Sequence, residues 1–340
     1  MKASLYDPAE GYYRRSDLTR WGREGDYRTS PERSELFAAT FARHFAKLYD
    51  DLGQPSDWTI VECGAGDGRF AEGVLRSSDT GRYVVCDSSP DSLKRARERL
   101  REFPARVEFC SEVELPCVEH GVFFSNELFD AFPVHRLVKQ DGEVQEMYVT
   151  VGADNDFVWF TGSLSTPRLS EFCREHSLEL SEGQFIEIDL EVEDWLAKVS
   201  SRLKRGFVIT VDYGAEAEEL YDPALRSNGT LRAFSKHGFV DDVLAQPGEY
   251  DITSSVNWTQ VKLAGERAGL KTVDFASQDK FLLDAGLLEV LEQRLTKIES
   301  EAEKLSLTTG AREMILPGGM ASSFQVLVQQ RVEEEVADVT

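Results

Sequence analysis

A glycine-rich turn directly after an apolar strand constrains this sequence more than any other feature. The apolar run WTIVEC at 58–63 predicts a buried strand, and a helix is expected at 69–78. Between them stand Gly64, Gly66 and Gly68, in the spacing GxGxG. Glycine lets the backbone of such a turn approach a nucleotide-like ligand, because no Cβ is in the way. The turn therefore predicts a doubly wound α/β fold with a cofactor site beside its first strand.

The spacing of the glycines separates two classes of cofactor. A dinucleotide-binding turn reads GxGxxG, which would place its third glycine at position 69, where this sequence has Arg69. The tighter spacing GxGxG is typical of folds that bind S-adenosylmethionine (SAM), which has no pyrophosphate. A glycine-rich turn alone is a weak signal, because such turns are common in loops. An NAD-dependent oxidoreductase therefore stays as the less favoured alternative.

Apolar strands and amphipathic helices alternate after this turn. Further strands are expected at 83–87, 107–113 and 121–130, with a capped amphipathic helix at 88–103. Strands that are apolar along their length are typical of a parallel sheet with both faces covered. The predicted fold is therefore a Rossmann-like α/β sheet with helices on both faces, which a strand at 206–214 rejoins later in the chain.

A different pattern interrupts this sheet. Asp141-Gly142 separates two alternating runs, as in a β-hairpin, and a further strand and a short helix follow. We assign residues 135–204 to an insertion of antiparallel strands and helix that serves the substrate. Residues 51–134 and 205–340 are assigned to the SAM-binding core.

Helical spacing predicts further elements at both ends of the chain. Apolar residues recur at helical intervals over 36–52. A helix is also expected at 259–270, a long charged helix near 284–305 and a final strand at 322–330.

Two segments are expected to cover the ligand. Residues 215–258 are polar and rich in loop-forming residues, which predicts lid-like loops beside the core. Residues 1–50 are assigned to an N-terminal segment and helix that close over the cofactor. In that segment Thr29 or Ser30 can cap the helix, with Pro31 in its first turn.

Two carboxylates are candidates to contact the cofactor. Asp87 ends the second strand about twenty residues after the first glycine, where a carboxylate can accept from both hydroxyls of a ribose. The alternative role of Asp87 is to cap the next helix, although Ser88 and Ser89 are available for that. Glu62 is either a buried carboxylate near the methionine amine or a charge at the sheet surface.

Polar residues follow the strand that ends near position 126. Asn126, Glu127 and Asp130 stand where parallel strands face the ligand crevice. A guanidinium is best held by planar carboxylate pairs, so Glu127 and Asp130 are candidates to orient an arginine. The alternatives are a solvated Glu127 and a turn capped by Asp130. His135 is a candidate to accept a proton after transfer, with a structural role as its alternative.

The acidic composition is explained most simply by solubility, and a basic protein partner is the alternative explanation. Lys and Arg total 38 and Asp and Glu total 61, which gives a net charge of −23. The electrostatic field of such a charge repels nucleic acid and anionic membranes. The same field attracts a basic, arginine-bearing segment. Five cysteines without a CxxC pair argue against a metal site. The sequence has no apolar run long enough to predict membrane insertion. We therefore expect a cytoplasmic protein, either a monomer or a homodimer.

Nearly the whole chain resembles the MidA-like methyltransferases, a family that includes the mitochondrial complex I assembly factor that methylates arginine. The similar blocks occur in the order of the family: LYDPAEGYY, GDYRTSPERSELFA, VECGAGDGRF, SNELFDAFPVHRL, ITVDYG, GTLRAFSKH, PGEYDITSSVNW and GMASSFQVLV. The blocks around Asn126 and Thr29 are the most specific. The resemblance implies a SAM-dependent methyltransferase that acts on a protein arginine, with a complex I subunit as an example of its acceptor.

The same resemblance implies roles for individual residues. It implies cofactor contacts at the three glycines, ribose contacts at Asp87, acceptor contacts at Asn126, Glu127 and Asp130, and closure over the cofactor by Thr29, Ser30 and Pro31. Ser255 and Asn257 depart from the family, which usually has a His and an Asp there. We expect this change to alter substrate specificity. A SAM-binding assembly factor with little transfer activity stays as an alternative.

Overall fold

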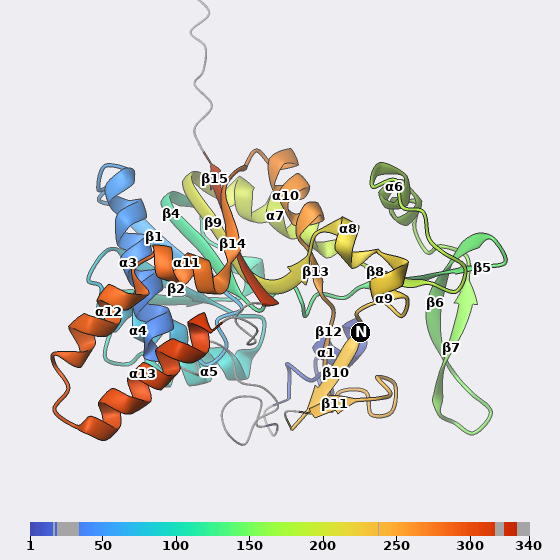
Figure 1. Cartoon of the computed structure of the whole chain (residues 1–340), viewed down its shortest axis with the longest axis horizontal. Coiled ribbons are helices and arrows are strands. Elements are labelled where there is room, and N and C mark those ends of the chain that lie inside the picture. The colour runs from blue at the N-terminus through green and yellow to red at the C-terminus, as the bar shows by residue number, and fades with distance from the viewer. Residues whose placement is uncertain (16–17, 19–33, 237, 317–322, 332–340) are drawn as a thin grey trace, which may run out of the picture. The chain divides into compact units, whose positions relative to one another are not determined.

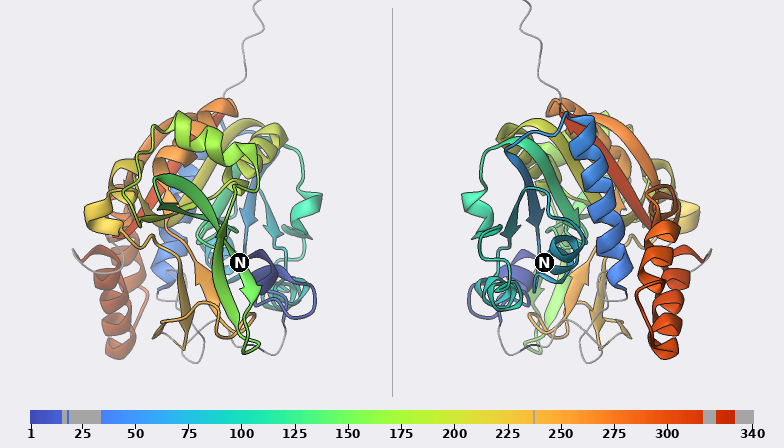
Figure 2. Two further views of the ribbon diagram at one scale, coloured as in Figure 1. Left: turned by 90° about the vertical axis from the view of Figure 1, so that its right-hand side faces the viewer. Right: turned by 90° about the vertical axis from the view of Figure 1, so that its left-hand side faces the viewer.

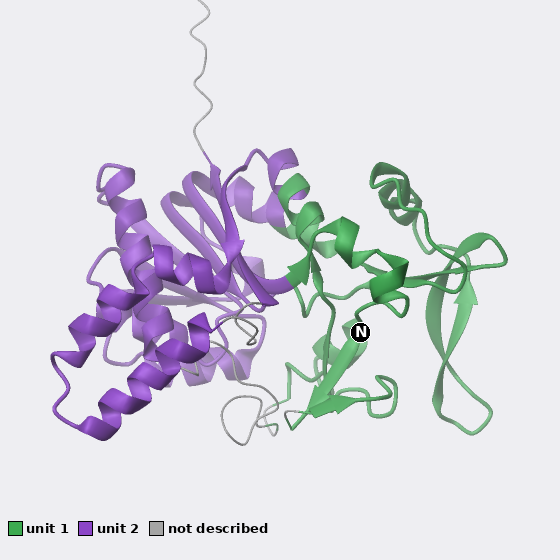
Figure 3. Cartoon of the chain, viewed as in Figure 1, with its two compact units in different colours: residues 1–27, 129–195, 214–263 green, residues 28–128, 196–213, 264–340 purple. Residues whose placement is uncertain are grey.

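The chain folds into two compact units, each built from separate stretches of sequence (Figure 3). The computed structural model describes residues 1–15, 18, 34–236, 238–316 and 323–331. Unit 1 comprises residues 1–27, 129–195 and 214–263, and unit 2 comprises residues 28–128, 196–213 and 264–340. Each unit therefore depends on contacts between distant parts of the sequence.

A mostly parallel sheet forms the centre of unit 2 (Figure 1). Its strands lie in the order β14-β15-β9-β4-β1-β2-β3. Their bounds are β1 Trp58–Cys63, β2 Arg82–Cys86, β3 Val107–Cys110, β4 Val118–Asn126, β9 Leu203–Ala215, β14 Lys271–Ser277 and β15 Phe324–Arg331. Only β15 pairs antiparallel, with β9 on one side and β14 on the other. The predicted Rossmann-like sheet is confirmed.

Side chains of this sheet are buried on both faces. Ile60, Val122 and Phe124 belong to one apolar core, whereas the adjacent Val61 and Phe123 are buried outside it. Successive residues of a strand point to opposite faces, so the two sets cover the two sides of the sheet. This double burial is the reason why the strands are apolar along their length.

Aromatic side chains join the helices of unit 2 to its sheet. The helices are α3 Glu35–Asp51, α4 Arg69–Ser77, α5 Pro90–Arg99, α11 Gln278–Asp284, α12 Leu287–Leu295 and α13 Glu301–Ile315, with a 3₁₀ turn at Glu112–Glu114. Phe70 of α4 stacks on Phe124 of β4, with ring centres 4.3 Å apart, and Phe41 of α3 meets Phe124 at 5.1 Å. Both helices are thereby fixed on one face of the sheet, where α3 is drawn in blue in Figure 2.

The helix predicted at 36–52 is confirmed, but its cap differs from the prediction. α3 begins at Glu35, and the Ser34 side chain accepts a hydrogen bond from the Leu36 amide at 3.2 Å. Ser34 satisfies one of the free amides of the first turn, so α3 needs no cap from Thr29 or Ser30. Those two residues and Pro31 lie outside the described part of the chain.

Two antiparallel sheets build most of unit 1. The first has the order β7-β6-β5-β8, and the second has the order β11-β10-β12. Their bounds are β5 His135–Gln140, β6 Glu143–Val151, β7 Phe157–Gly162, β8 Phe185–Ile188, β10 Arg232–Ser235, β11 Gly238–Val240 and β12 Asp251–Thr253. The short strand β13 (Val256–Asn257) pairs with the last two residues of β9.

Short helices complete unit 1. They are α1 Lys2–Tyr6, α6 Pro167–Glu175, α8 Ala217–Leu220 and α9 Pro223–Arg226. Two longer helices, α7 Glu191–Arg202 and α10 Trp258–Arg267, begin in unit 1 and end in unit 2. An apolar core that includes Leu137, Leu169, Ile186 and Tyr221 holds the first sheet to α6 and α8.

The predicted hairpin at Asp141-Gly142 is confirmed. β5 and β6 pair antiparallel, and their last pair is Gln140 with Glu143. Only Asp141 and Gly142 stand between the two strands. Asp141 has φ 54° and Gly142 has φ 81°. Positive φ at both central positions is the type I′ geometry, which matches the twist of the flanking strands.

Residues 215–258, which the sequence predicts to be rich in loops, also contain short helices and strands. This stretch contains α8, α9 and four short strands, and it belongs to the same compact unit as residues 129–195. The Gln184 side chain donates to the Tyr221 carbonyl at 2.8 Å, and Phe185 bridges to Asn228. These contacts join residues 215–258 to the sheet β7-β6-β5-β8. The sequence alone assigns the same residues to the SAM-binding core. Strands of three or four residues leave too little periodicity to be recognised in a polar sequence.

The prediction of a single long helix near 284–305 was wrong, because two separate helices occur there. α12 ends at Leu295 and α13 begins at Glu301. The Ser300 side chain accepts from the Glu303 amide at 3.4 Å and so caps the new helix. A serine cap within a charged sequence can start a new helix, which a continuous charged pattern conceals.

Candidate functional site

The carboxyl ends of four neighbouring strands meet at one edge of the unit 2 sheet. Cys63 of β1 pairs with Cys86 of β2 and Ser125 of β4, and Asn126 of β4 pairs with Val211 of β9. Residues that follow paired positions of parallel strands lie next to each other. This edge therefore carries the glycine turn, Asp87, Asn126, Glu127 and Asp212.

All three glycines of the turn have left-handed backbone conformations. Their φ values are 70° at Gly64, 55° at Gly66 and 78° at Gly68. A Cβ on Gly64 would lie 3.0 Å from Leu128, and one on Gly68 would lie 3.0 Å from Ala96 of α5. Glycine is thus required at this turn by conformation at each position and by packing at two of them.

Asp87 holds the glycine turn against the end of β2. Its Oδ2 accepts from the Gly66 amide at 2.8 Å, and its Oδ1 accepts from the Ser89 amide at 2.7 Å. Ser89 is the N-cap of α5, and its hydroxyl accepts from the Ser92 amide. Each carboxylate oxygen can accept more than one hydrogen bond, so Asp87 remains able to bind a ribose diol. A backbone free of Cβ atoms beside a fixed carboxylate fits an adenosine-bearing cofactor.

Arg99 of α5 clamps the same turn from its other side. Its Nε donates to the Asp67 carbonyl at 3.0 Å, and its Nη2 donates to the Asp67 carboxylate at 2.6 Å. Its Nη1 reaches Glu72 of α4 at 3.2 Å. The guanidinium therefore joins α5 to the turn and to α4. Arg99 was not predicted, because an arginine on the polar face of an amphipathic helix carries no signal of its own.

Glu62 is buried inside the sheet, which is inconsistent with the alternative of a surface charge. The residue is 5% exposed, and its Oε2 accepts from the Tyr83 hydroxyl at 2.7 Å. Burial raises the pKa of Glu62 to about 8, although the Tyr83 hydrogen bond opposes the shift. The carboxyl group is therefore mostly protonated at neutral pH. Its place near the methionine amine remains a prediction.

Asn126 and Glu127 form a strained corner after β4. Glu127 has φ 52°, and its amide donates to the Val211 carbonyl at 2.9 Å. The Asn126 Nδ2 donates to the Glu127 carboxylate at 3.0 Å. Among the described residues, none donates to the buried Asn126 Oδ1. A non-glycine residue in the left-handed region costs about 1–3 kcal/mol, and such strain is found most often at functional sites.

Asp212 is a further carboxylate at this edge, and it was not among the predicted site residues. It is fully buried near the end of β9, and its two oxygens accept from the Leu128 and Tyr213 amides at 3.2 and 2.9 Å. It thereby fixes the chain just after Glu127. The signal was present, because Asp212 directly follows the buried run 207–211 of β9, as Asn126 follows the buried run of β4.

The other two predicted acceptor residues, Asp130 and His135, belong to unit 1. Asp130 is buried, and its carbonyl accepts from the Ser254 amide at 2.9 Å. His135 Nδ1 lies 2.7 Å from the Glu146 carboxylate. This contact accords with the structural alternative for His135, while its role as a proton acceptor remains a prediction.

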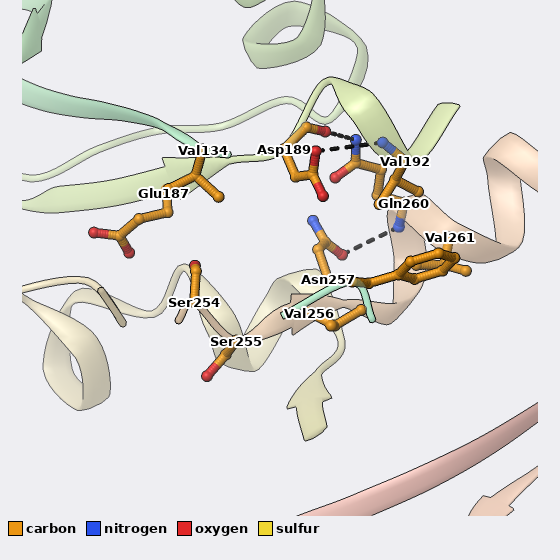
Figure 4. Close-up of a pocket in the computed structure, with 11 residues that line it drawn as sticks. Val134, Glu187, Asp189, Val192, Ser254, Ser255, Val256, Asn257, Gln260 and Val261 are labelled. Atoms are coloured by element: carbon orange, nitrogen blue, oxygen red, sulfur yellow. Dashed lines mark hydrogen bonds between the residues drawn. The ribbon is translucent and has the colours of Figure 1, made fainter. Parts of the chain in front are cut away.

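A pocket in unit 1 contains both positions at which the sequence departs from the family pattern (Figure 4). Ser255 and Asn257 line it, opposite Glu187 and Asp189 at the end of β8. The Asn257 Oδ1 accepts from the Gln260 amide at 3.1 Å, and its Nδ2 donates to the Tyr221 hydroxyl at 3.1 Å. No group of three metal-ligating side chains occurs among the described residues.

The glycine turn and the acidic residue after the second strand together define a protein that binds an adenosine-bearing cofactor at the carboxyl edge of a Rossmann-like sheet. The chain belongs to the family described as "Putative S-adenosyl-L-methionine-dependent methyltransferase", whose model matches residues 40–276. Its cofactor is therefore SAM, and the chain is a methyltransferase.

Named relatives and a solved structure match over almost the full chain. The mitochondrial protein arginine methyltransferase NDUFAF7 homolog of Drosophila melanogaster is 26% identical, over 96% of this chain and 79% of its own length. The human NDUFAF7 is 24% identical, over 98% and 80%. A Burkholderia thailandensis protein crystallised with S-adenosylhomocysteine superposes with a TM-score of 0.87 at 30% identity, over 97% of this chain and 86% of its own.

The comparison corrects one expectation from the sequence. A cytoplasmic location was expected, and this is wrong by the comparison, because both curated relatives are named as mitochondrial proteins. As for the membrane, no helix of the described residues is long and apolar enough to span a bilayer.

Proposed function

We propose that this methyltransferase transfers the methyl group of SAM to an arginine side chain of a partner protein. Two relatives that match almost the whole chain are named protein arginine methyltransferases. The observation that carries the proposal is the strand edge of unit 2. There the Glu127 carboxylate follows β4, and the glycine turn follows the neighbouring strand β1. A carboxylate that can bind a guanidinium thus lies beside the turn that fits the cofactor.

The cofactor residues have distinct tasks. Bound SAM supplies an electrophilic methyl group on its sulfonium. The glycine turn gives close access to the backbone, and Asp87 accepts from the ribose hydroxyls while it holds the Gly66 amide. The glycines of this turn that contact the cofactor are Gly64, Gly66 and Gly68. Glu62 lies near the methionine amine of the cofactor. Closure over the cofactor is assigned to Thr29, Ser30 and Pro31.

The acceptor residues bind and orient the arginine. Asn126 fixes one oxygen of Glu127, so the carboxylate presents a set orientation to a planar guanidinium. Asp130 contributes a second carboxylate. With Nδ1 of His135 bonded to Glu146, its Nε2 is the nitrogen available to accept a proton. Holding the acceptor in line is the main contribution that the protein can make to a displacement reaction.

The partner is proposed to present a basic segment. The net charge of −23 attracts cationic chains over a long range at low ionic strength. A subunit of respiratory complex I is the kind of acceptor that the family resemblance suggests.

Calorimetry and mass spectrometry test this function in sequence. The purified protein is titrated with SAM and, separately, with NAD, and we expect binding of SAM alone. It is then incubated with SAM and paired basic peptides that contain either arginine or lysine at one position. Methylarginine in the first peptide only is the expected product. SAM binding without any transfer would instead support the assembly-factor alternative, and absence of SAM binding would overturn the proposal.

A further inference from the structure

The outer half of the β6–β7 hairpin is a two-stranded ribbon with exposed apolar side chains. It belongs to the long green hairpin in Figure 1. β5 pairs with β6 only from Glu143 to Met147, whereas β7 pairs with β6 as far as Val151. Five apolar residues of the hairpin are each 40–56% exposed: Val149, Val151, Phe157, Val158 and Phe160. A two-stranded ribbon is only marginally stable by itself, so these side chains would gain from a cover.

The exposed apolar residues lie on both faces of the ribbon. Val151 pairs with Phe157, and residues that pair directly point to the same face. Val158 follows Phe157 in the strand and so points to the opposite face, which it shares with Phe160. An antiparallel sheet with one face in water ordinarily alternates apolar and polar residues. That alternation is largely absent from this ribbon.

β7 is also an open sheet edge. It is the end strand in the order β7-β6-β5-β8, and within the described part of the chain no strand pairs with its outer side. Natural sheets protect such edges with charged side chains, proline or a β-bulge. The β7 sequence, FVWFTG, has no charge and no proline, and its pairing with β6 is regular over all six residues. The backbone of this edge is therefore unprotected against pairing with a further strand.

The distribution of charge indicates which kind of strand fits this edge. Residues 147–153 and 157–163 contain no charged side chain, and Asp154 and Asp156 stand in the turn between the strands. A basic segment, of the kind proposed as methyl acceptor, would find no counter-ions along β7. The matching strand is instead apolar and uncharged, and β7 of a second copy has these properties.

A second copy also satisfies the geometry of the edge. Two copies of one strand can pair antiparallel around a two-fold axis perpendicular to the sheet, so every contact occurs twice. Such pairing joins the two four-stranded sheets into one continuous sheet. Val158 and Phe160 on one face, and Phe157 on the other, then lie beside their counterparts in the second copy.

We infer that the open edge of β7 is a dimer interface, where the protein pairs with a second copy of itself. This association is separate from the proposed function and needs no methyl transfer. Apolar contacts and backbone hydrogen bonds favour the dimer, whereas the net charge of −23 on each copy opposes it. Added salt screens that repulsion, so the dimer should become tighter as the salt concentration rises. Binding of a basic segment would have the opposite dependence on salt.

Sedimentation velocity of the full chain measures the association. We expect a monomer–dimer equilibrium in which the dimer fraction rises with protein concentration and with NaCl concentration. A chain that stays monomeric at every concentration would overturn the inference. A dimer that dissociates when salt is added would do the same.

Val158→Lys tests whether β7 forms the interface. Lysine is a common natural residue on exposed sheet edges, so the fold should tolerate it. We expect the dimer dissociation constant to rise by about tenfold or more, because two like charges meet near the axis. Val113→Lys makes the same change at a valine of unit 2 that is 83% exposed, and it also matches the change in net charge. Equal dissociation constants in the two variants would place the interface elsewhere and reject the inference.

Hydrogen exchange locates the interface without a substitution. Edge pairing gives hydrogen-bond partners to the outward amides of β7, so exchange in the peptide 157–163 should slow as the dimer forms. β3, the end strand of the sheet in unit 2, is the matched control and should exchange at one rate at all concentrations. Protection at β3 but not at β7 would contradict the inference. Neither sedimentation nor exchange involves methyl transfer, so the dimer and the proposed function can fail independently.

Discussion

Gly64, Gly66 and Gly68 share a sequence pattern but have different neighbours. Gly64 faces Leu128, Gly68 faces α5 at Ala96, and the amide of Gly66 donates to Asp87. Larger residues at Gly64 or Gly68 would therefore disturb the packing of the fold itself. Gly66 is the position where a substitution reports most directly on the cofactor.

We expect Gly66→Val to abolish measurable SAM binding. A branched side chain at φ 55° is strained, and it stands where the cofactor must approach. Gly53→Val is the matched control, because Gly53 has φ 84° and a Cβ there would meet nothing within 4 Å. Calorimetric titration should find normal SAM affinity in the control. Unchanged affinity in Gly66→Val would remove the turn from the cofactor site.

We expect Glu127→Ala to retain SAM affinity and to lose methyl transfer. The substitution removes the carboxylate that is proposed to orient the guanidinium, while the glycine turn and Asp87 are left intact. Methylarginine formation and SAM titration measure the two properties separately. Glu119→Ala, at an exposed ion pair with Lys204, is the control. Wild-type transfer rates in Glu127→Ala would exclude Glu127 from the mechanism.

Glu62 should make the stability of the protein fall as pH rises. Its pKa is about 8 in the folded chain, above the ordinary value of 4.5. Between these two values the folded state binds more protons than the unfolded state, so the free energy of unfolding decreases with pH, by at most about 1.4 kcal/mol per pH unit. Urea denaturation from pH 5 to 8 measures this slope. Glu62→Gln should have a smaller slope than the wild type, and equal slopes would contradict the assignment.

Single residues were predictable where a pattern fixes their position in the chain. Asp87 follows from its distance to the glycine turn, and Asn126 follows from the end of a buried strand. Asp189 was not predicted, because it follows a strand of four residues and resembles any other acidic residue in a charged sequence. Its place in a pocket is a property of tertiary structure alone.

Among the structural elements, α5 controls the glycine turn through Arg99. We expect Arg99→Met to weaken SAM binding severalfold, because the two hydrogen bonds to Asp67 that hold the turn are lost. Arg76→Met is the matched control, since Arg76 bonds Glu72 and Glu102 without contact to the turn. Thermal unfolding of both variants measures the cost to stability separately. Equal SAM affinity in the two variants would show that the clamp has no part in cofactor binding.

Elements with strong local signals were predicted, and short ones were not. The strands of the parallel sheet and the hairpin at Asp141-Gly142 follow from apolar runs and turn chemistry. The sheet β11-β10-β12 has strands of three or four residues, which are held by pairing with one another and by a small apolar core around Ala233 and Ile252. Long-range pairing of this kind cannot be recognised from a local pattern.

For the whole molecule, the net charge of −23 predicts a salt-dependent encounter with the partner. We expect the association rate with a basic peptide to fall steeply between 50 mM and 500 mM NaCl, because added salt shortens the range of the attraction. Stopped-flow fluorescence with a labelled peptide measures it, and a peptide with the same arginine but no net charge is the control. A rate that is independent of salt would show that the acidic composition does not guide association.

The position of β15 has a consequence for how the protein is made. This strand lies between β9 and β14, although it is the last element of the described chain. During translation β9 therefore emerges with its apolar edge uncovered, and it stays so until residues 324–331 have been synthesised. An open apolar edge is a site for pairing with other chains. Nascent chains that stall before Phe324 should consequently depend on chaperones, because the sheet is not complete until β15 has been made.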